Sequence, residues 1–208
     1  LIGYLILGLL LWDNIPTLEF TRIMLSLGIM LVIAVLVLER TRRNTLQLTT
    51  LAHIDALTSV GNRRALDNKL AEVIDSSDEN TDFCIMLIDL DHFKNINDKY
   101  GHPEGDEVLK KLTALLAKLL GDSNQLYRYG GEEFVALTNS DLDLSMHIAE
   151  KIRATVSTTS FNNKIIKISI GLTTLRGNDT PLSVIDRADK ALLMAKTRGR
   201  DQVYVSNT

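Results

Sequence analysis

The stretch Tyr127-Arg128-Tyr129-Gly130-Gly131-Glu132-Glu133-Phe134 organises the predicted fold, because two adjacent glycines stand directly before two adjacent carboxylates. Strand-forming residues flank the glycines, and glycine accepts the positive φ angles of a tight turn. The stretch therefore predicts a β-hairpin with a bare tip. The carboxylates are expected to begin the return strand, where alternation points Glu132 and Glu133 to opposite faces. Such a turn suits a metal-bound phosphate, although an ordinary solvated turn can have the same sequence.

A second group of carboxylates follows an apolar stretch. Phe83–Ile88 is a continuous apolar run, typical of a strand buried on both faces, and it ends at Asp89-Leu90-Asp91. A carboxylate at the end of a buried strand is costly unless it is paired or bound to a metal. Mg²⁺ prefers a few carboxylate oxygens together with substrate phosphates. If the two strands are antiparallel neighbours, Asp89 and Glu132 meet and form a metal site.

The segment from His92 to Asp106 is predicted to be a loop that carries groups for a ligand. Lys94 follows Asp89 closely enough to bring a cation to a phosphate beside the metal. Asn97 and Asp106 offer the donors and acceptors that a guanine edge requires, and a buried polar mismatch would exclude adenine. Each of these residue types is also common in loops and helix caps, so an ordinary structural role stays open for each.

Regular elements are predicted around these motifs. Helices are expected over residues 63–75, capped by Asn62, and over residues 107–120, 142–156 and 181–197. A strand or hairpin arm is expected over residues 165–175, with Gly171 at a bulge or bend. A last strand is expected over residues 202–205.

A series of motifs runs in order along residues 55–205. They are Asp55-x-Leu57-Thr58, Asn62-Arg63-Arg64, Asp89-Leu90-Asp91-His92-Phe93-Lys94-x-x-Asn97-Asp98, Tyr100-Gly101-His102-x-x-Gly105-Asp106, Gly130-Gly131-Glu132-Glu133-Phe134, Ser169-Ile170-Gly171 and the residues from Ala188 to Arg200. Together they resemble the GGDEF domain of diguanylate cyclases. The resemblance implies an α/β (α+β) fold with a palm-like, mainly antiparallel central sheet flanked by helices, as in nucleotidyl cyclases.

The resemblance also implies an activity, the condensation of two GTP into cyclic di-GMP with release of two pyrophosphates across a homodimer. It implies two Mg²⁺ or Mn²⁺ per active site, held by Asp89, the Leu90 carbonyl and Glu132. The implied catalytic residues are Glu132, Glu133 and Lys94. The implied substrate-binding residues are Phe93, Asn97, His102, Asp106, Gly130, Gly131, Lys196 and Arg200.

The sequence departs from the family pattern at a few positions. The product-inhibition motif Arg-x-x-Asp would fall at Gly121-Asp122-Ser123-Asn124, where neither residue is in its place, so cyclic di-GMP feedback at that site is not expected. Asp106 favours GTP for both halves, since relatives that accept ATP commonly have serine there. Leu193 replaces a usual Tyr and Asp201 a usual Asn, and both are expected to change only packing.

The first part of the chain has a different composition. Residues 1–38 contain only Asp13, Glu19 and Arg22 as charged residues. The uncharged run Ile23–Leu38, with the residues before it, reaches the ~20 residues that cross a bilayer. Arginines follow at positions 40, 42 and 43, which places the next residues in the cytoplasm. A buried soluble helix is the alternative.

We therefore predict a protein of the cytoplasmic membrane with its catalytic domain in the cytoplasm. Residues 1–38 form the transmembrane region, with a partial span at 1–12 and a full span at about 19–38; residues 39–54 form a linker helix, and residues 55–208 form the GGDEF domain. Because the chain begins with Leu, it is expected to be a fragment of a longer membrane protein.

Composition and the intact motifs limit the classes of function that the chain can have. The formal net charge of −3 argues against binding of a nucleic acid polymer, which usually requires a basic surface. The single Cys84 lies in an apolar run and is expected to be a core residue. The alternative to an enzyme is a catalytically silent domain that binds GTP or cyclic di-GMP as a receptor. The intact carboxylates favour the enzyme.

Overall fold

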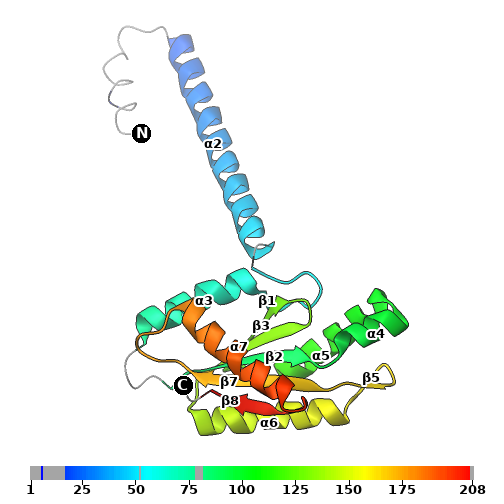
Figure 1. Ribbon diagram of the computed structural model, residues 1–208. Helices are drawn as coiled ribbons and strands as arrows, with labels where there is room; N and C mark the ends of the chain where they lie inside the picture. The colour runs from blue at the N-terminus through cyan, green and yellow to red at the C-terminus, as the bar shows by residue number, and fades with distance from the viewer. Residues whose placement is uncertain (1–5, 7–16, 52, 78–81, 207–208) are drawn as a thin grey trace. The chain divides into compact units, whose positions relative to one another are not determined.

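The computed structural model describes Ile6 and residues 17–51, 53–77 and 82–206 (Figure 1). The chain divides into two compact units, Leu1–Thr50 and Leu51–Thr208, and each is described by itself. The predicted partial span at residues 1–12 lies outside the described residues, apart from Ile6.

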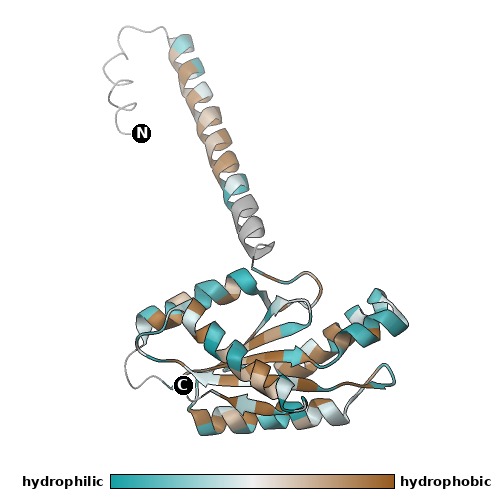
Figure 2. Cartoon of the chain, in the orientation of Figure 1, coloured by the Kyte–Doolittle hydropathy of each residue, from teal (hydrophilic) through white to brown (hydrophobic). Residues whose placement is uncertain are grey.

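The first unit is built on one long helix, α2, which spans Thr17–Leu51. The segment Glu19–Arg42 has a mean hydropathy of 2.5, and most of it is coloured as hydrophobic in Figure 2. None of its most apolar window is buried, so its apolar side chains are exposed. In the described part of the chain, α2 is the one helix long and apolar enough to cross a membrane. The helix continues without a break through most of the predicted linker.

The second unit is organised around a six-stranded sheet in the order β1-β3-β4-β2-β7-β8. The strands are β1 (Gly61–Asn62), β2 (Cys84–Leu90), β3 (Gln125–Gly130), β4 (Glu133–Thr138), β7 (Ile168–Thr174) and β8 (Val203–Val205). The four central strands pair antiparallel, whereas β1 pairs with β3, and β8 with β7, in parallel. The predicted mainly antiparallel sheet is confirmed. A separate small hairpin is formed by β5 (Ser160–Phe161) and β6 (Lys164–Ile165).

Helices cover both faces of the sheet. They are α3 (Arg63–Ser76), α4 (Phe93–Tyr100), α5 (His102–Leu120), α6 (Leu142–Thr158) and α7 (Pro181–Thr197). The predicted start of α3 is confirmed, because the Asn62 side chain accepts a hydrogen bond from the backbone N–H of Ala65. The predicted bounds of α7 are also confirmed, with a capping box at Thr180 and Ser183.

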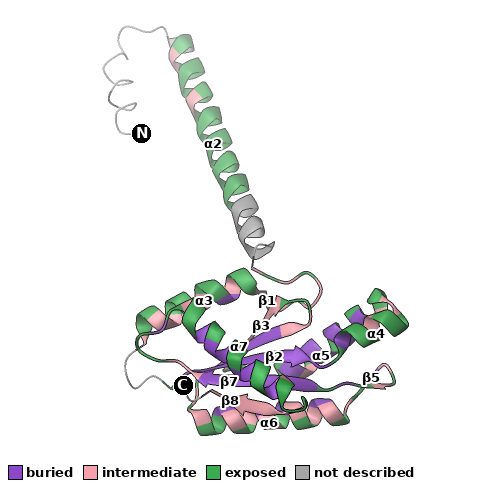
Figure 3. Cartoon of the chain, viewed as in Figure 1, coloured by how far each residue is buried: buried purple, intermediate pink, exposed green. Residues whose placement is uncertain are grey.

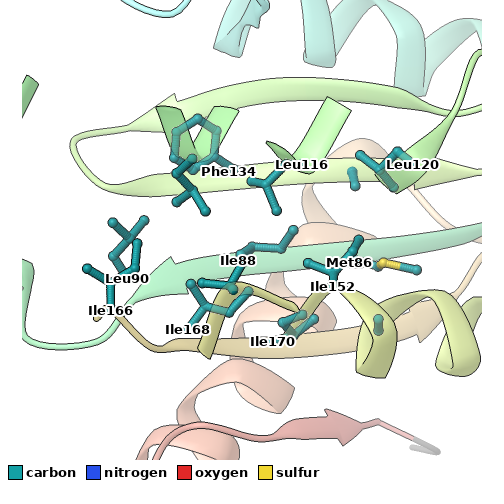
Figure 4. Close-up of a cluster of buried hydrophobic side chains, with 14 of the residues drawn as sticks. Met86, Ile88, Leu90, Leu116, Leu120, Phe134, Ile152, Ile166, Ile168 and Ile170 are labelled. Atoms are coloured by element: carbon teal, nitrogen blue, oxygen red, sulfur yellow. The ribbon is translucent and has the colours of Figure 1, made fainter. Parts of the chain in front are cut away.

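The core lies in two layers, one on each face of the sheet. Strand β2 is buried along its whole length (Figure 3). Its side chains alternate between the two layers. Met86 and Ile88 pack with α5 and α6 around Phe134 (Figure 4). Ile85 and Leu87 pack with α3 and α7. Each fully buried side chain of this size contributes about 1.5–3 kcal/mol, so β2 is the centre of the fold.

Two local predictions were wrong. The expected loop from His92 to Asp106 is helical, since α4 and the start of α5 occupy it; Phe93 is buried and Ile96 packs one turn later. Gly171 lies within the regular strand β7 and not at a bulge. A Cβ there would overlap the backbone of Ala188 and Leu192, so the glycine is needed because α7 lies very close.

Candidate functional site

The antiparallel pairing of β2 with β4 brings carboxylates from the two strands together. Asp89 is the cross-strand partner of Glu133 on one side and of Ser169 on the other. The predicted hairpin is confirmed, but Glu132 does not begin the return strand, because it lies in the turn with Gly131. The register shifts between Arg128 and Gly130, so β3 has one extra residue opposite β4 just before the turn.

The glycine turn is open on its outer side. A Cβ at Gly130 or Gly131 would meet nothing within 4 Å, and Gly131 has a φ of +50°. The backbone there is therefore free for close approach by a ligand. This agrees with the predicted role of the two glycines.

Asp89 is a buried carboxylate with one cationic partner. It is 7% exposed, and its Oδ2 lies 2.8 Å from the Lys196 Nζ. Burial raises the pKa of Asp89, the ion pair with Lys196 opposes this, and the charge of Glu132 raises it further; the net pKa is raised. Burial likewise raises the pKa of Glu133, with Asp89 adding to the effect. The site thus holds more negative charge than Lys196 balances.

This donor set fits the divalent ions that the resemblance to the GGDEF domain implies. Mg²⁺ and Mn²⁺ prefer oxygen ligands, and the unbalanced carboxylates of Asp89, Glu132 and Glu133 supply them. Across the described ranges, no cluster of three or more His, Cys, Asp or Glu side chains is arranged to hold a metal by itself. The protein therefore offers a partial ligand set, which substrate phosphates would complete.

Asp91 has a structural role that the sequence did not reveal. It is 9% exposed; its Oδ1 accepts a hydrogen bond from Ser169 Oγ (2.8 Å) and its Oδ2 from the Asp201 N–H (3.0 Å). It therefore fixes the turn after α7, where Arg200 and Asp201 have φ values of 63° and 47°. The Arg200 Nε lies 3.9 Å from Asp91 Oδ1. The exposed Arg200 is thereby held beside the end of β2.

The aspartate at position 201, where relatives usually have asparagine, changes charge pairing as well as packing. Its carboxylate forms ion pairs with Arg153 (2.9 Å) and Lys167 (2.8 Å), which join α6 and the start of β7 to the turn. An asparagine could not form these ion pairs. The expectation of a packing change alone was therefore wrong, because the partners come from distant parts of the chain.

The predicted guanine-reading residues lie on α4 and α5. Asn97 Oδ1 is a buried acceptor without a hydrogen-bond partner within the described structure. It packs against Gly105, where a Cβ would overlap it. Buried acceptors are normally satisfied, so this oxygen marks a place for a donor from a ligand. His102 and Asp106 are exposed at the start of α5, and Lys94 is exposed on α4.

The predicted site residues thus form two groups. Asp89, Glu132, Glu133 and Lys196 gather at the hairpin, with Arg200 beside Asp91. Lys94, Asn97, His102 and Asp106 belong to α4 and α5. Phe93 is 5% exposed in the core, so its backbone, and not its side chain, is left for a ligand.

Residues 52–202 match the family described as "Diguanylate cyclase, GGDEF domain". A probable diguanylate cyclase of Escherichia coli (strain K12), DgcT, is 38% identical over 163 residues, which cover 74% of this chain and 36% of that protein. An uncharacterized membrane protein of Staphylococcus haemolyticus is 40% identical over 158 residues, which cover 72% of this chain and 44% of that protein.

A solved structure is similar over most of the chain. The coiled coil and GGDEF domain of DgcB from Caulobacter crescentus, solved in complex with c-di-GMP, superposes with a TM-score of 0.76 and 30% identity. The match covers 86% of this chain and 99% of that one. The two curated relatives are longer, since the chain spans less than half the length of each.

Proposed function

The chain belongs to the GGDEF family of diguanylate cyclases, and on that premise we propose that it condenses two GTP into cyclic di-GMP and two pyrophosphates. The observation that carries the proposal is the buried Asp89, paired in register with Glu133 and facing the open turn that holds Glu132. A buried, under-neutralised carboxylate weakens the fold unless it serves a bound cation.

The residues divide the chemistry between them. Asp89, the Leu90 carbonyl and Glu132 would hold two Mg²⁺ or Mn²⁺, which when bound polarise the attacked α-phosphate and lower the pKa of the 3′-hydroxyl. Glu132 accepts the proton of the 3′-hydroxyl. Glu133, the first residue of β4, assists Glu132 in this step. Lys94, Lys196 and Arg200 neutralise the triphosphate. The open Gly130-Gly131 backbone lets the phosphates approach.

Guanine is recognised at the corner between α4 and α5. The unpaired Asn97 Oδ1 accepts a hydrogen bond from the base, and the exposed Asp106 accepts from its N1–H and amino group. His102 lies at the start of the same helix. A carboxylate at Asp106 leaves adenine with an unpaired polar edge, which selects GTP.

Two copies of the domain supply one nucleotide each. Because the product contains two guanosines and one site holds one GTP, two domains face each other across a two-fold axis. The initial rate of residues 51–208 should therefore rise more steeply than in proportion to concentration while the domain is monomeric. A strictly proportional rate in that range would exclude the dimer.

The membrane segment determines where in the cell the proposed reaction takes place. Helix α2 would anchor the chain in the cytoplasmic membrane, with the catalytic domain in the cytoplasm and GTP as a cytoplasmic substrate. The relative from Staphylococcus haemolyticus is described as a membrane protein, which supports the same placement.

The direct test is product formation by the whole chain with GTP and Mg²⁺. The wild type should make cyclic di-GMP, Glu132→Gln should lose it, and Glu72→Gln, a carboxylate change on the exposed face of α3, should keep it. If the wild type stays silent even when dimerised through a fused coiled coil, yet binds GTP or cyclic di-GMP, the chain is a receptor and the enzyme proposal fails.

A further inference from the structure

Arg128 connects two turns that lie far apart in the sequence. Its Nε and NH2 both donate to the carbonyl oxygen of Gly131, at 3.0 and 2.8 Å. Its NH1 donates to Asp55 Oδ1 at 3.0 Å. The Arg128 and Asp55 side chains are 15% and 22% exposed, so the charge-assisted bond between them is partly buried, whereas the two bonds to the Gly131 carbonyl lie at the exposed turn. We call these contacts the Arg128 clamp.

The Asp55 end of the clamp is itself held in place. Asp55 Oδ1 also accepts hydrogen bonds from the Thr58 N–H (2.9 Å) and hydroxyl (2.6 Å). The backbone closes the same turn, since Asp55 N–H donates to Val60 O (2.8 Å) and Ser59 N–H to Asp55 O (2.9 Å). Partial burial raises the pKa of Asp55, but the bonds from Thr58 and Arg128 outweigh it and the net pKa is lowered. The carboxylate is therefore ionised and fixed.

The Gly131 end of the clamp needs such support. Gly131 lies outside the β3–β4 ladder, after the register shift at Arg128 and Gly130. A side chain at this position would find no packing partner, because a Cβ at Gly131 would meet nothing within 4 Å. The paired donors of Arg128 are thus the contacts that fix the Gly131 carbonyl. The next residue is Glu132, whose side chain must be placed within a fraction of an ångström to act.

All three guanidinium nitrogens of Arg128 are engaged with protein acceptors. These bonds use three of the five guanidinium N–H groups and hold the guanidinium against the protein, which favours a positioning role over a direct role on the substrate. Lysine would not replace the arginine, because it lacks the planar fork that reaches two acceptors at once.

We propose that Arg128 is a positioning residue that fixes Glu132 through the Gly131 carbonyl, and that Asp55 orients Arg128 for this task. The turn from Asp55 to Val60 and the turn of the β3–β4 hairpin then move as one unit. The catalytic consequence rests on the proposed function, whereas the structural consequence does not.

The structural test is hydrogen exchange by mass spectrometry on the whole chain in detergent. Arg128→Ala and Asp55→Asn should each speed exchange at residues 129–133, and the double variant should not exceed the larger single effect. Arg64→Ala removes an equal charge from the exposed face of α3 and should leave these peptides unchanged. Unchanged exchange at residues 129–133 in Arg128→Ala would overturn the proposal.

The kinetic test separates positioning from binding. Arg128→Ala should lower kcat by about 10- to 100-fold, as misplacement of a catalytic group does, with KM for GTP nearly unchanged. Arg128→Lys should not restore kcat. A raised KM with normal kcat would mean that Arg128 binds GTP directly, and would overturn the positioning role. If the wild type makes no product but the exchange still responds, the proposed function fails and the clamp stands.

Discussion

At the residue scale, Asp89 is a buried carboxylate of the candidate site, and its surroundings determine what it costs the folded state. The strand around it is buried, the charges of Glu132 and Asp91 raise its pKa, and Lys196 is its cationic partner. An ionised group in this position lowers the stability of the folded state, because burial outweighs the ion pair. On the proposed function, Asp89 serves the chemistry at the expense of stability.

Asp89→Asn should accordingly stabilise the protein while removing its activity. The amide keeps the shape and an acceptor for Lys196 but removes a buried charge, so the free energy of unfolding should rise by roughly 1 kcal/mol. The measurement is urea unfolding in EDTA at pH 7. The matched variant Asp91→Asn should instead lose about 1–3 kcal/mol, since both of its oxygens accept hydrogen bonds. A loss of stability in Asp89→Asn would contradict this account.

Asn97→Ala should weaken GTP binding without weakening the fold. The Oδ1 atom has no partner in the described structure, so its removal costs the protein no internal bond. Loss of one hydrogen bond to the base should raise KM for GTP up to about tenfold. The checks are steady-state kinetics and a thermal melt; a lower melting temperature with unchanged KM would show that Asn97 is structural.

At the scale of elements, the contact between β7 and α7 positions the cationic end of the site. Helix α7 lies so close to β7 that only glycine fits at position 171. Small residues on the facing side of the helix, Ala188, Ala191 and Ala195, allow this approach and are buried. Lys196 follows directly, so the packing of this helix brings its ammonium to Asp89.

Gly171→Ala tests this contact. The added methyl would overlap the backbone of α7, which cannot move as a flexible side chain would, so we expect a loss of about 1–3 kcal/mol. Gly177→Ala is the control, since a Cβ there meets nothing within 4 Å. Chemical unfolding of both variants gives the comparison, and equal stabilities would refute the close-packing explanation.

A buried ion pair locks the start of α7 to the end of β7. Asp179 Oδ2 lies 2.5 Å from Arg187 NH2, and Arg187 also donates to Thr173 Oγ1 and the Thr174 carbonyl. Burial raises the pKa of Asp179, but bonds from Arg187 and Ser183 outweigh it and the net pKa is lowered.

This pair should give the protein an acid-dependent stability. Because the folded pKa is below the unfolded value, the stabilisation is present above pH 3.8 and is lost as pH falls through the folded pKa. Asp179→Asn should cost about 3 kcal/mol at pH 7 and should flatten the pH dependence below pH 4. Unfolding curves at stepwise lower pH measure both effects; an unchanged slope in the variant would assign the acid sensitivity to other carboxylates.

At the scale of the whole molecule, the chain combines an apolar helix with a domain that has its own core. The most apolar window of α2 has no burial, whereas the domain from Leu51 onward holds the sheet and both core layers. A helix of this composition is not stable with its apolar surface in water.

Fractionation of expressing cells tests this division. The whole chain should stay in the membrane pellet after an alkaline carbonate wash, and residues 51–208 should stay in the supernatant as a folded domain. Release of the whole chain by carbonate would show that α2 does not span the membrane.

The sequence by itself determined the elements whose patterns are long or strongly punctuated. The apolar run of β2, the glycine hairpin, the Asn62 cap and the bounds of α7 follow from local periodicity and from turn and cap chemistry. The family and the candidate residues followed from the order of the motifs. These signals are local or sequential, so no tertiary contact was needed to find them.

The tertiary structure alone decided the features that depend on distant partners. Helix α4 is short, and its burial against the core through Phe93 overrides its polar sequence. The need for Gly171 comes from α7, and the ion pairs of Asp201 come from α6 and the start of β7. The Arg128 clamp joins residues 73 positions apart. Packing and charge pairing across such separations arise only when the sheet has formed, and for that reason no local pattern reports them.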